Sequence, residues 1–171
     1  MRQKKQRILA VSGVKNFGKT TLITKLLTEL KKRGLEVAVI KHDGHDFQAD
    51  VPDTDSWKYA QAGACGTCVF SEQKHMVIKY MSALSTEKLI QTFSEADVIL
   101  LEGVKYSEYP KIEVIRRRNS SKSVCDPSYL WGGVMTDYRP EELGEMLSGI
   151  PFFGLEETGR LTDYIMEKWS K

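Results

Sequence analysis

Apolar residues recur along this chain in two patterns, short continuous runs and stripes at helical spacing. Residues 7–12 form a run suited to a buried strand. Residues 20–33 repeat Leu and Ile at positions on one face of a helix, and Gly34 is a good residue to end that helix. A second run follows at 36–42. Strand, helix and strand in this order predict a parallel pair with a crossover helix, and therefore an α/β fold.

The same patterns continue to the end of the chain. Further strands are predicted at 97–103, 130–137 and 151–155. Residues 111–116 alternate polar and apolar, which predicts a strand with one wet face near a sheet edge. Two runs, 66–71 and 75–80, predict a hairpin added to the sheet. Helices are predicted for four segments: 57–62, 85–93, a segment that begins near Pro140, and 156–169. We expect one domain over residues 1–171, with a mostly parallel sheet flanked by helices.

The residues between the first strand and the first helix, Gly13 to Thr20, fit the phosphate-binding pattern G-x-x-x-x-G-K-[ST]. With Gly at about 7% of residues, the four fixed positions match by chance in only about one chain in a few hundred of this length. A loop between a strand and a helix directs backbone N–H groups and the positive end of the helix dipole at one anion. We expect the loop, including Lys15, Asn16 and Thr21, to bind the phosphates of a nucleotide in a P-loop NTPase-like fold.

Single residues of this loop have predicted roles. Gly13 and Gly18 permit backbone angles and a close approach that a Cβ forbids. Lys19 would reach the β- and γ-phosphates, which makes it a predicted catalytic residue, and the Thr20 hydroxyl would bind Mg²⁺. The simpler alternative is a glycine turn capped by Thr20 or Thr21, with Lys19 exposed.

Residues 97–103 have the form of a Walker B strand, in which apolar residues end in a carboxylate, here Glu102. In P-loop enzymes an acid at this place holds Mg²⁺ directly or through water, or orients the attacking water. Taken alone, the segment is a buried strand with an acidic last residue. Together with the phosphate loop, it makes Glu102 a predicted catalytic and metal-binding residue.

A polar cluster, residues 41–46, follows the second predicted strand and contains two His and two Asp. Open α/β sheets bind ligands beyond the carboxyl ends of their strands. These residue types are also common metal ligands, so the cluster is a predicted part of the site. A polar loop at the edge of a sheet accounts for the same residues.

Composition narrows the class of protein. The chain has 171 residues, of which 41% are hydrophobic and 28% charged, as in an ordinary globular protein. Its 25 basic and 23 acidic residues leave a net charge of +2, which gives no support for nucleic acid or a membrane surface as a partner. The apolar run after the basic N-terminus is too short for a signal peptide, and no stretch approaches membrane-spanning length. We therefore expect a cytoplasmic protein.

The three cysteines are an odd number and are expected to be reduced thiols. Cys65 and Cys68 have the spacing of half a zinc site, but Cys125 is alone and remote in sequence. We expect no metal at Cys65 and Cys68.

Together the motifs resemble the molybdopterin-guanine dinucleotide biosynthesis protein B family, P-loop GTP-binding proteins of molybdenum cofactor assembly. The resemblance rests on four blocks in the same order: residues 13–21, residues 41–47, Asp55-Ser56 followed by 62–64, and residues 101–105 followed by 110–114. The phosphate loop is generic to many NTPases, whereas Glu102-Gly103 with the later Pro110-Lys111-Ile112-Glu113 is much more particular. The blocks cover most of residues 8–116, and the last third of the chain matches only loosely.

The resemblance implies a homodimer that binds GTP, hydrolyses it weakly, and assists a partner guanylyltransferase that joins GMP to molybdopterin. The chain itself would be at most a slow Mg²⁺-dependent GTPase acting as an adaptor, and direct binding of molybdopterin is left open. Carried onto this sequence, the family's phosphate and Mg²⁺ ligands fall on Gly13, Gly18, Lys19, Thr20 and Thr21. Glu102 takes the Walker B place, and Asp43 is the further metal-facing acid.

The usual guanine-reading motif of GTPases, N/T-K-x-D, is absent. Asp137 is the predicted reader of the base, because its carboxylate can accept from both the ring N–H and the exocyclic amine of guanine. Adenine offers no such pair of donors. A cap of the turn before Pro140 explains Asp137 equally well.

Three other functions fit parts of the sequence. A small-molecule kinase would use Arg116–Arg118 and Lys122 to clamp a phosphoryl acceptor, although a solvated turn explains this basic segment too. A non-catalytic adaptor would bind only nucleotide and partner. A metallochaperone-type GTPase would use His42, His45 and the cysteines. No residue is identified as an arginine finger, so GTP hydrolysis is expected to be slow.

Overall fold

The computed structural model describes residues 6–45, 47–80, 84–116, 123–135 and 149–171. The chain divides into two compact units, the first made of residues 1–42 and 89–171 and the second of residues 43–88. The sequence did not reveal this division. That residues 1–171 work as one nucleotide-binding domain stays a prediction.

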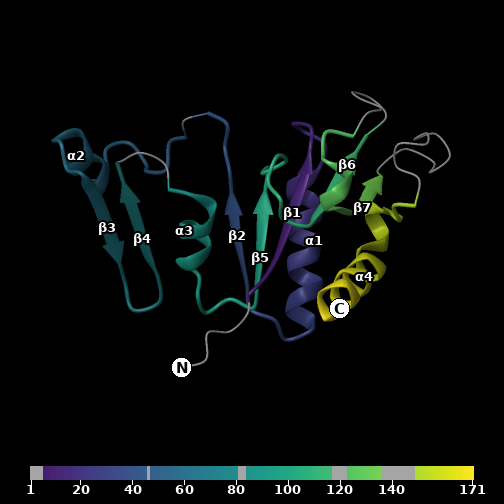
Figure 1. Cartoon of the computed structure of the whole chain (residues 1–171). Coiled ribbons are helices and arrows are strands. Elements are labelled where there is room, and N and C mark those ends of the chain that lie inside the picture. Colours follow the sequence, from purple (N-terminus) through teal and green to yellow (C-terminus); the bar gives the residue numbers. More distant parts are fainter. Residues whose placement is uncertain (1–5, 46, 81–83, 117–122, 136–148) are drawn as a thin grey trace. The chain divides into compact units, whose positions relative to one another are not determined.

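The first unit contains a six-stranded parallel sheet in the order β2-β5-β1-β6-β7-β8 (Figure 1). Its strands are β1 (Arg7–Gly13), β2 (Val37–Lys41), β5 (Val98–Glu102), β6 (Lys111–Ile115), β7 (Leu130–Met135) and β8 (Phe152–Gly154). The parallel order confirms the α/β, P-loop NTPase-like fold predicted from the sequence. It also brings the carboxyl ends of β1, β5 and β6 together at one edge of the sheet.

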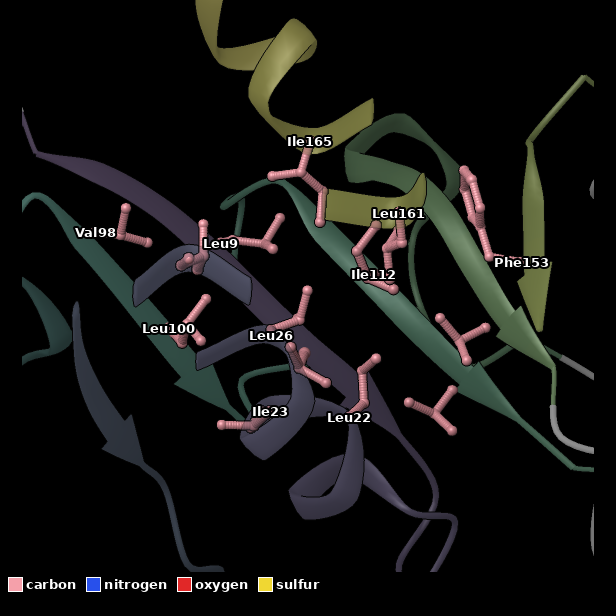
Figure 2. Close-up of a cluster of buried hydrophobic side chains, with 14 of the residues drawn as sticks. Leu9, Leu22, Ile23, Leu26, Val98, Leu100, Ile112, Phe153, Leu161 and Ile165 are labelled. Atoms are coloured by element: carbon pink, nitrogen blue, oxygen red, sulfur yellow. The ribbon is translucent and has the colours of Figure 1, made fainter. Parts of the chain in front are cut away.

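Two long helices, α1 (Lys19–Lys32) and α4 (Thr158–Ser170), pack against the sheet. Figure 2 shows their buried side chains with those of the strands, among them Leu22 and Leu26 from α1, Leu161 and Ile165 from α4, and Leu9 from β1. Side chains alternate along a strand, so Ala10 points to the opposite face and joins a second cluster with Ile90 and Ile99. The sheet therefore has a hydrophobic core on each face, which holds the edge that carries the phosphate loop.

The ends of the predicted helices agree closely with the sequence. Gly34 follows α1 with a φ of +75°, a left-handed conformation that glycine adopts without strain. The short helices α2 (Asp55–Gln61) and α3 (Thr86–Gln91) occur where helices were predicted. The Thr54 hydroxyl caps α2 by accepting a hydrogen bond from the Trp57 N–H at 3.4 Å.

The second unit contains the predicted hairpin, formed by the antiparallel strands β3 (Gly66–Phe70) and β4 (His75–Lys79). These strands form a separate two-stranded sheet, so the expectation that the hairpin joins the main sheet was wrong. Sequence patterns specify local pairing through the turn, but the backbone hydrogen bonds that would attach an outer strand carry no side-chain signal.

The prediction of a half-exposed strand at 111–116 was also wrong. β6 lies between β1 and β7, and all five of its residues are buried. Its polar residues Lys111 and Glu113 are buried because other parts of the chain satisfy their hydrogen bonds, as shown below. Alternation of polar and apolar residues does not distinguish such internal partners from water.

Several predicted features lie outside the described residues: Asp46, the basic segment 117–122, Thr136 with Asp137, and the helix near Pro140. Among the residues that are described, no helix is both long enough and apolar enough to cross a membrane.

Candidate functional site

The phosphate loop connects β1 to α1 and is held by close backbone contacts with β6. Gly13 pairs with Val114, and a Cβ at Gly13 would lie 2.5 Å from the Val114 carbonyl oxygen. Gly13 and Gly18 have φ values of +133° and +97°. Both glycines therefore have the conformation for which the pattern requires glycine, and at Gly13 a side chain is also sterically excluded.

The middle of the loop is fixed from inside the protein. Phe17 is 1% exposed and belongs to the core that α1 and α4 share. Asn16 before it has a positive φ of +65°, and Lys15 and Asn16 are exposed. A buried aromatic anchor beneath an exposed polar turn gives the loop a defined shape. The sequence shows Phe17 only as a variable position of the pattern.

Lys19, the first residue of α1, folds back over the loop. Its Nζ donates hydrogen bonds to the Gly13 carbonyl at 3.2 Å and to the Val14 carbonyl at 2.9 Å. Burial lowers the pKa of Lys19, and the nearby Glu102 carboxylate opposes that shift by favouring the charged amine. The alternative in which Lys19 is an exposed side chain beside a simple turn is therefore not what the structure describes.

Thr20 and Glu102 join the start of α1 to the end of β5. The Thr20 Oγ1 donates a hydrogen bond to the Glu102 Oε1 at 3.2 Å, and Glu102 is 7% exposed. Hydroxyl and carboxylate oxygens are the ligands that Mg²⁺ prefers. The two side chains predicted to hold Mg²⁺ thus lie within hydrogen-bond distance of each other. Their oxygen atoms fit the ligands that the ion prefers.

Two further lysines lie around this site. Lys41 ends β2 and pairs in register with Glu102, while Lys105 follows β5. Both lower the pKa of Lys19 through charge repulsion, which places their charges near the phosphate loop. Three lysines around one carboxylate make this edge of the sheet favourable for an anion. In the sequence, Lys41 is part of the polar cluster after the second strand, but no individual role is assigned to Lys41 or Lys105.

A buried polar network on β6 lies next to the strand that leads into the loop. Glu113 pairs in register with Ser12 and accepts hydrogen bonds from the Ser123 hydroxyl at 2.5 Å and the Val124 N–H at 2.7 Å. Burial, followed by the charge of Glu113, raises the pKa of the Cys125 thiol to about 12. These hydrogen bonds attach residues 123 and 124 to β6 at Glu113, which pairs with the residue just before the phosphate loop.

Other predicted residues are not brought to this site by the described contacts. Asp43 and His45 belong to the second unit, where the Asp43 carboxylate accepts a hydrogen bond from the His45 N–H at 3.4 Å. Within the described ranges, no group of three or more His, Cys, Asp or Glu residues is arranged to hold a metal ion. Asp137 lies outside these ranges.

The chain is similar to known proteins over the region that contains these residues. A family model described as molybdopterin guanine dinucleotide synthesis protein B matches residues 8–134. A Haemophilus influenzae protein named molybdopterin-guanine dinucleotide biosynthesis adapter protein is 30% identical over 165 residues, 95% of this chain and 88% of that protein. An Escherichia coli protein of the same name is 36% identical over 116 residues, which are 64% of this chain and 65% of that protein.

Solved structures agree with the sequence relatives. The crystal structure of Bacillus subtilis MobB has a TM-score of 0.77 and 25% identity, and the match covers 95% of this chain and 97% of that one.

Proposed function

This chain belongs to the molybdopterin guanine dinucleotide synthesis protein B family, and from that premise we propose that it is a GTP-dependent adapter protein. In this proposal it binds GTP with Mg²⁺ at the loop from Gly13 to Thr21 and hydrolyses GTP slowly. The protein then assists a guanylyltransferase that attaches GMP to molybdopterin in the cytoplasm.

The observation that carries this proposal is the arrangement of the loop and of the Lys19 and Thr20 side chains at the start of α1. Gly13 and Gly18 have the backbone conformation of a phosphate loop, and Lys19 and Thr20 are already held by hydrogen bonds on either side of it. The loop presents backbone N–H groups and the positive end of α1 to an anion. Lys41 and Lys105 add positive charge at the same edge.

The chemistry assigned to this site is phosphoryl transfer to water. Lys19 would bind the β- and γ-phosphates, and Thr20 with Glu102 would hold Mg²⁺. The ion, when bound, neutralises charge on the phosphates. Glu102 would also orient the attacking water, because its carboxylate lies at the end of β5 next to the loop.

The proposal has three further parts, which concern the base, the metal and the oligomeric state. Asp137 is proposed to accept from the two neighbouring donors of guanine. Asp43 is proposed as a further acid toward the metal. The protein is proposed to work as a homodimer, as the family resemblance implies.

Calorimetric titration with GTP, GDP and ATP, with and without Mg²⁺, tests nucleotide binding. We expect GTP to bind in a Mg²⁺-dependent way and more tightly than ATP. Lys19→Ala should abolish binding without changing the circular dichroism spectrum, because Lys19 belongs to the loop and not to the core. Lys31→Ala, an exposed change on the same helix, is the matched control. Unchanged GTP affinity in Lys19→Ala would reject the site.

The adapter role is tested in a reconstituted guanylyltransferase reaction. The rate of GMP attachment to molybdopterin should rise when this protein is added together with GTP. The Lys19→Ala protein should give a smaller increase than the parent. Stimulation that is equal with both proteins would favour an adaptor whose action does not need nucleotide.

A further inference from the structure

Arg116 follows the last residue of β6 and lies against the phosphate loop. A Cβ built on Gly18 would be 3.5 Å from the Arg116 Nη2. The position follows from the sheet, because β6 is the neighbour of β1 and Val114 pairs with Gly13. Two residues beyond that pair, the chain reaches the opposite end of the loop.

Gly18 directly precedes the two side chains that are predicted to bind the phosphates and Mg²⁺. It precedes Lys19, which is expected to bind the β- and γ-phosphates, and Thr20, which is expected to bind Mg²⁺. A guanidinium beside Gly18 therefore lies next to the loop that is expected to hold the phosphates. Glycine at position 18 leaves no side chain between this guanidinium and the loop.

The hydrogen-bonding state of Arg116 also indicates a ligand. Its Nε is buried and has no hydrogen-bond partner among the described residues. Nor is an ion pair between Arg116 and a carboxylate seen in that part of the chain. Buried donors in folded proteins are nearly always paired, and the planar guanidinium fork matches the oxygens of a phosphate.

We propose that Arg116 contacts the terminal phosphate of the bound nucleoside triphosphate, as an arginine supplied by the chain itself. This inference rests on the proposed function and deepens it, because it names the side chain that distinguishes a triphosphate from a diphosphate. From the sequence alone, no residue is identified as an arginine finger, and Arg116 enters only the kinase alternative, as part of a clamp for the phosphoryl acceptor. The sequence could not assign this role, since Arg116 is one of three consecutive arginines.

The test compares the affinities of a non-hydrolysable imido analogue of GTP and of GDP by calorimetry in Mg²⁺. Arg116→Ala should weaken binding of the analogue by about ten- to a hundredfold, the loss expected for a hydrogen bond to a charged group. GDP affinity should stay within about twofold of the parent, because GDP lacks the terminal phosphate. GTP hydrolysis should slow at saturating GTP, since such an arginine also stabilises transition-state charge.

Two further variants control the test. Arg116→Lys keeps the charge but loses the fork, so its analogue affinity should fall between the parent and Arg116→Ala. It also serves if Arg116→Ala fails to fold. Arg160→Ala removes an exposed arginine of α4 that pairs with Glu157, and should leave both affinities unchanged.

The outcomes separate this inference from the proposed function. If the parent binds neither ligand, the proposed function itself is wrong. If the parent binds both ligands and Arg116→Ala binds both equally well, only the role of Arg116 is overturned. Equal losses for the analogue and for GDP would also overturn it, because Arg116 would then be a general anion anchor or a structural residue.

Discussion

The Glu102 carboxylate has two neighbours of opposite kind, the Thr20 hydroxyl that donates to it and the Lys19 amine whose charge it favours. Glu102→Gln removes the charge and keeps the shape. We expect nucleotide binding to persist while Mg²⁺-dependent GTP hydrolysis falls at least about tenfold, because the variant loses a charged group that would position water and metal. Phosphate release at saturating GTP measures the effect.

The control for this variant is Glu156→Gln, which neutralises an exposed carboxylate paired with Lys25. It should hydrolyse GTP at the parental rate. A parental rate in Glu102→Gln as well would remove Glu102 from the chemistry and leave it as a cap for Thr20.

Cys125 differs from the other two cysteines in burial and therefore in reactivity. Its pKa is raised to about 12, so at pH 8 only about one thiol in ten thousand is ionised, and the thiolate is the reactive form. Iodoacetamide at pH 8 should modify the exposed Cys65 and Cys68 and leave Cys125 unmodified in the folded protein. Peptide mass spectrometry gives the result.

The same raised pKa has a defined sign for stability. Unfolded Cys125 ionises near its ordinary value of 9.0, before the folded thiol does. Its contribution to stability is therefore complete below pH 9.0 and is lost as the pH rises toward 12. Modification of Cys125 in urea but not in buffer is the expected control, and equal labelling of all three cysteines in buffer would contradict the prediction.

At the residue scale, the sequence predicts the chemistry of the loop better than its support. Gly13, Gly18, Lys19 and Thr20 come from a pattern with fixed spacing. Glu102 comes from a separate strand that ends in a carboxylate, and the fold brings it to Thr20. The supporting residues have no such signal. Phe17 occupies a variable position, and Glu113 is polar yet 2% exposed, because its partners Ser123 and Val124 arrive from a later segment.

At the scale of elements, the turn from β1 into the phosphate loop depends strictly on glycine at position 13. Gly13→Ala combines an unfavourable φ of +133° with a Cβ 2.5 Å from the Val114 carbonyl oxygen. We expect it to lower the free energy of unfolding by about 2–5 kcal/mol, from backbone strain and overpacking together. Urea denaturation measures this, and GTP binding should be lost with it.

Gly34→Ala is the matched control at the end of α1. Gly34 also has a positive φ, +75°, but a Cβ there would meet nothing within 4 Å. It should lose only about 1–2 kcal/mol, the strain of the left-handed conformation. If the two variants are equally destabilised, the contact with Val114 has no part in holding the loop.

The first residue of β6 stabilises the loop that follows Glu102. Lys111 is completely buried, and its Nζ donates to the Tyr109 carbonyl at 2.8 Å and to the Ser107 carbonyl. Lys111→Met keeps most of the volume but leaves these acceptors without a donor. We expect a loss of about 1–3 kcal/mol in the free energy of unfolding, measured in urea. Lys31→Met, at an exposed site of α1, should change it by less than about 0.5 kcal/mol. An unfolding free energy equal to the parent's would show that these hydrogen bonds do not hold the loop.

Element boundaries could be predicted well where the cause is local, and poorly where it is not. The ends of α1 and α2 follow from Gly34 and from the Thr54 cap. The central place of β6 and the separate sheet of β3 and β4 depend on which strands pair, and those pairings join residues far apart in the chain. The alternation in β6 therefore indicated water where the structure has Lys111 bonded to its own preceding loop.

For the whole molecule, the hairpin of the second unit is the feature that a single chain leaves incomplete. Among the described residues, β3 and β4 pair only with each other, so both outer edges of this small sheet lack strand partners. Two-stranded hairpins are marginally stable alone, and open edges favour pairing with another chain. The side chains of Val69, Phe70 and Val77 are 49%, 80% and 52% exposed. We therefore predict that a second copy covers the hairpin in the homodimer that the family resemblance implies.

The last prediction is that this self-association depends on the hairpin and not on the phosphate loop. The parent should sediment as a dimer at micromolar concentration. Val77→Asp should weaken the dimer at least about tenfold, because it places a charge on an apolar surface that the partner copy would desolvate. Val51→Asp is the matched control, an exposed valine of the same unit outside both strands. Lys19→Ala should dimerise like the parent, since the Lys19 amine donates its hydrogen bonds to the phosphate loop and lies in the other unit of the chain. A monomeric parent would contradict dimerisation itself, whereas a Val77→Asp protein that dimerises normally would place the interface away from the hairpin.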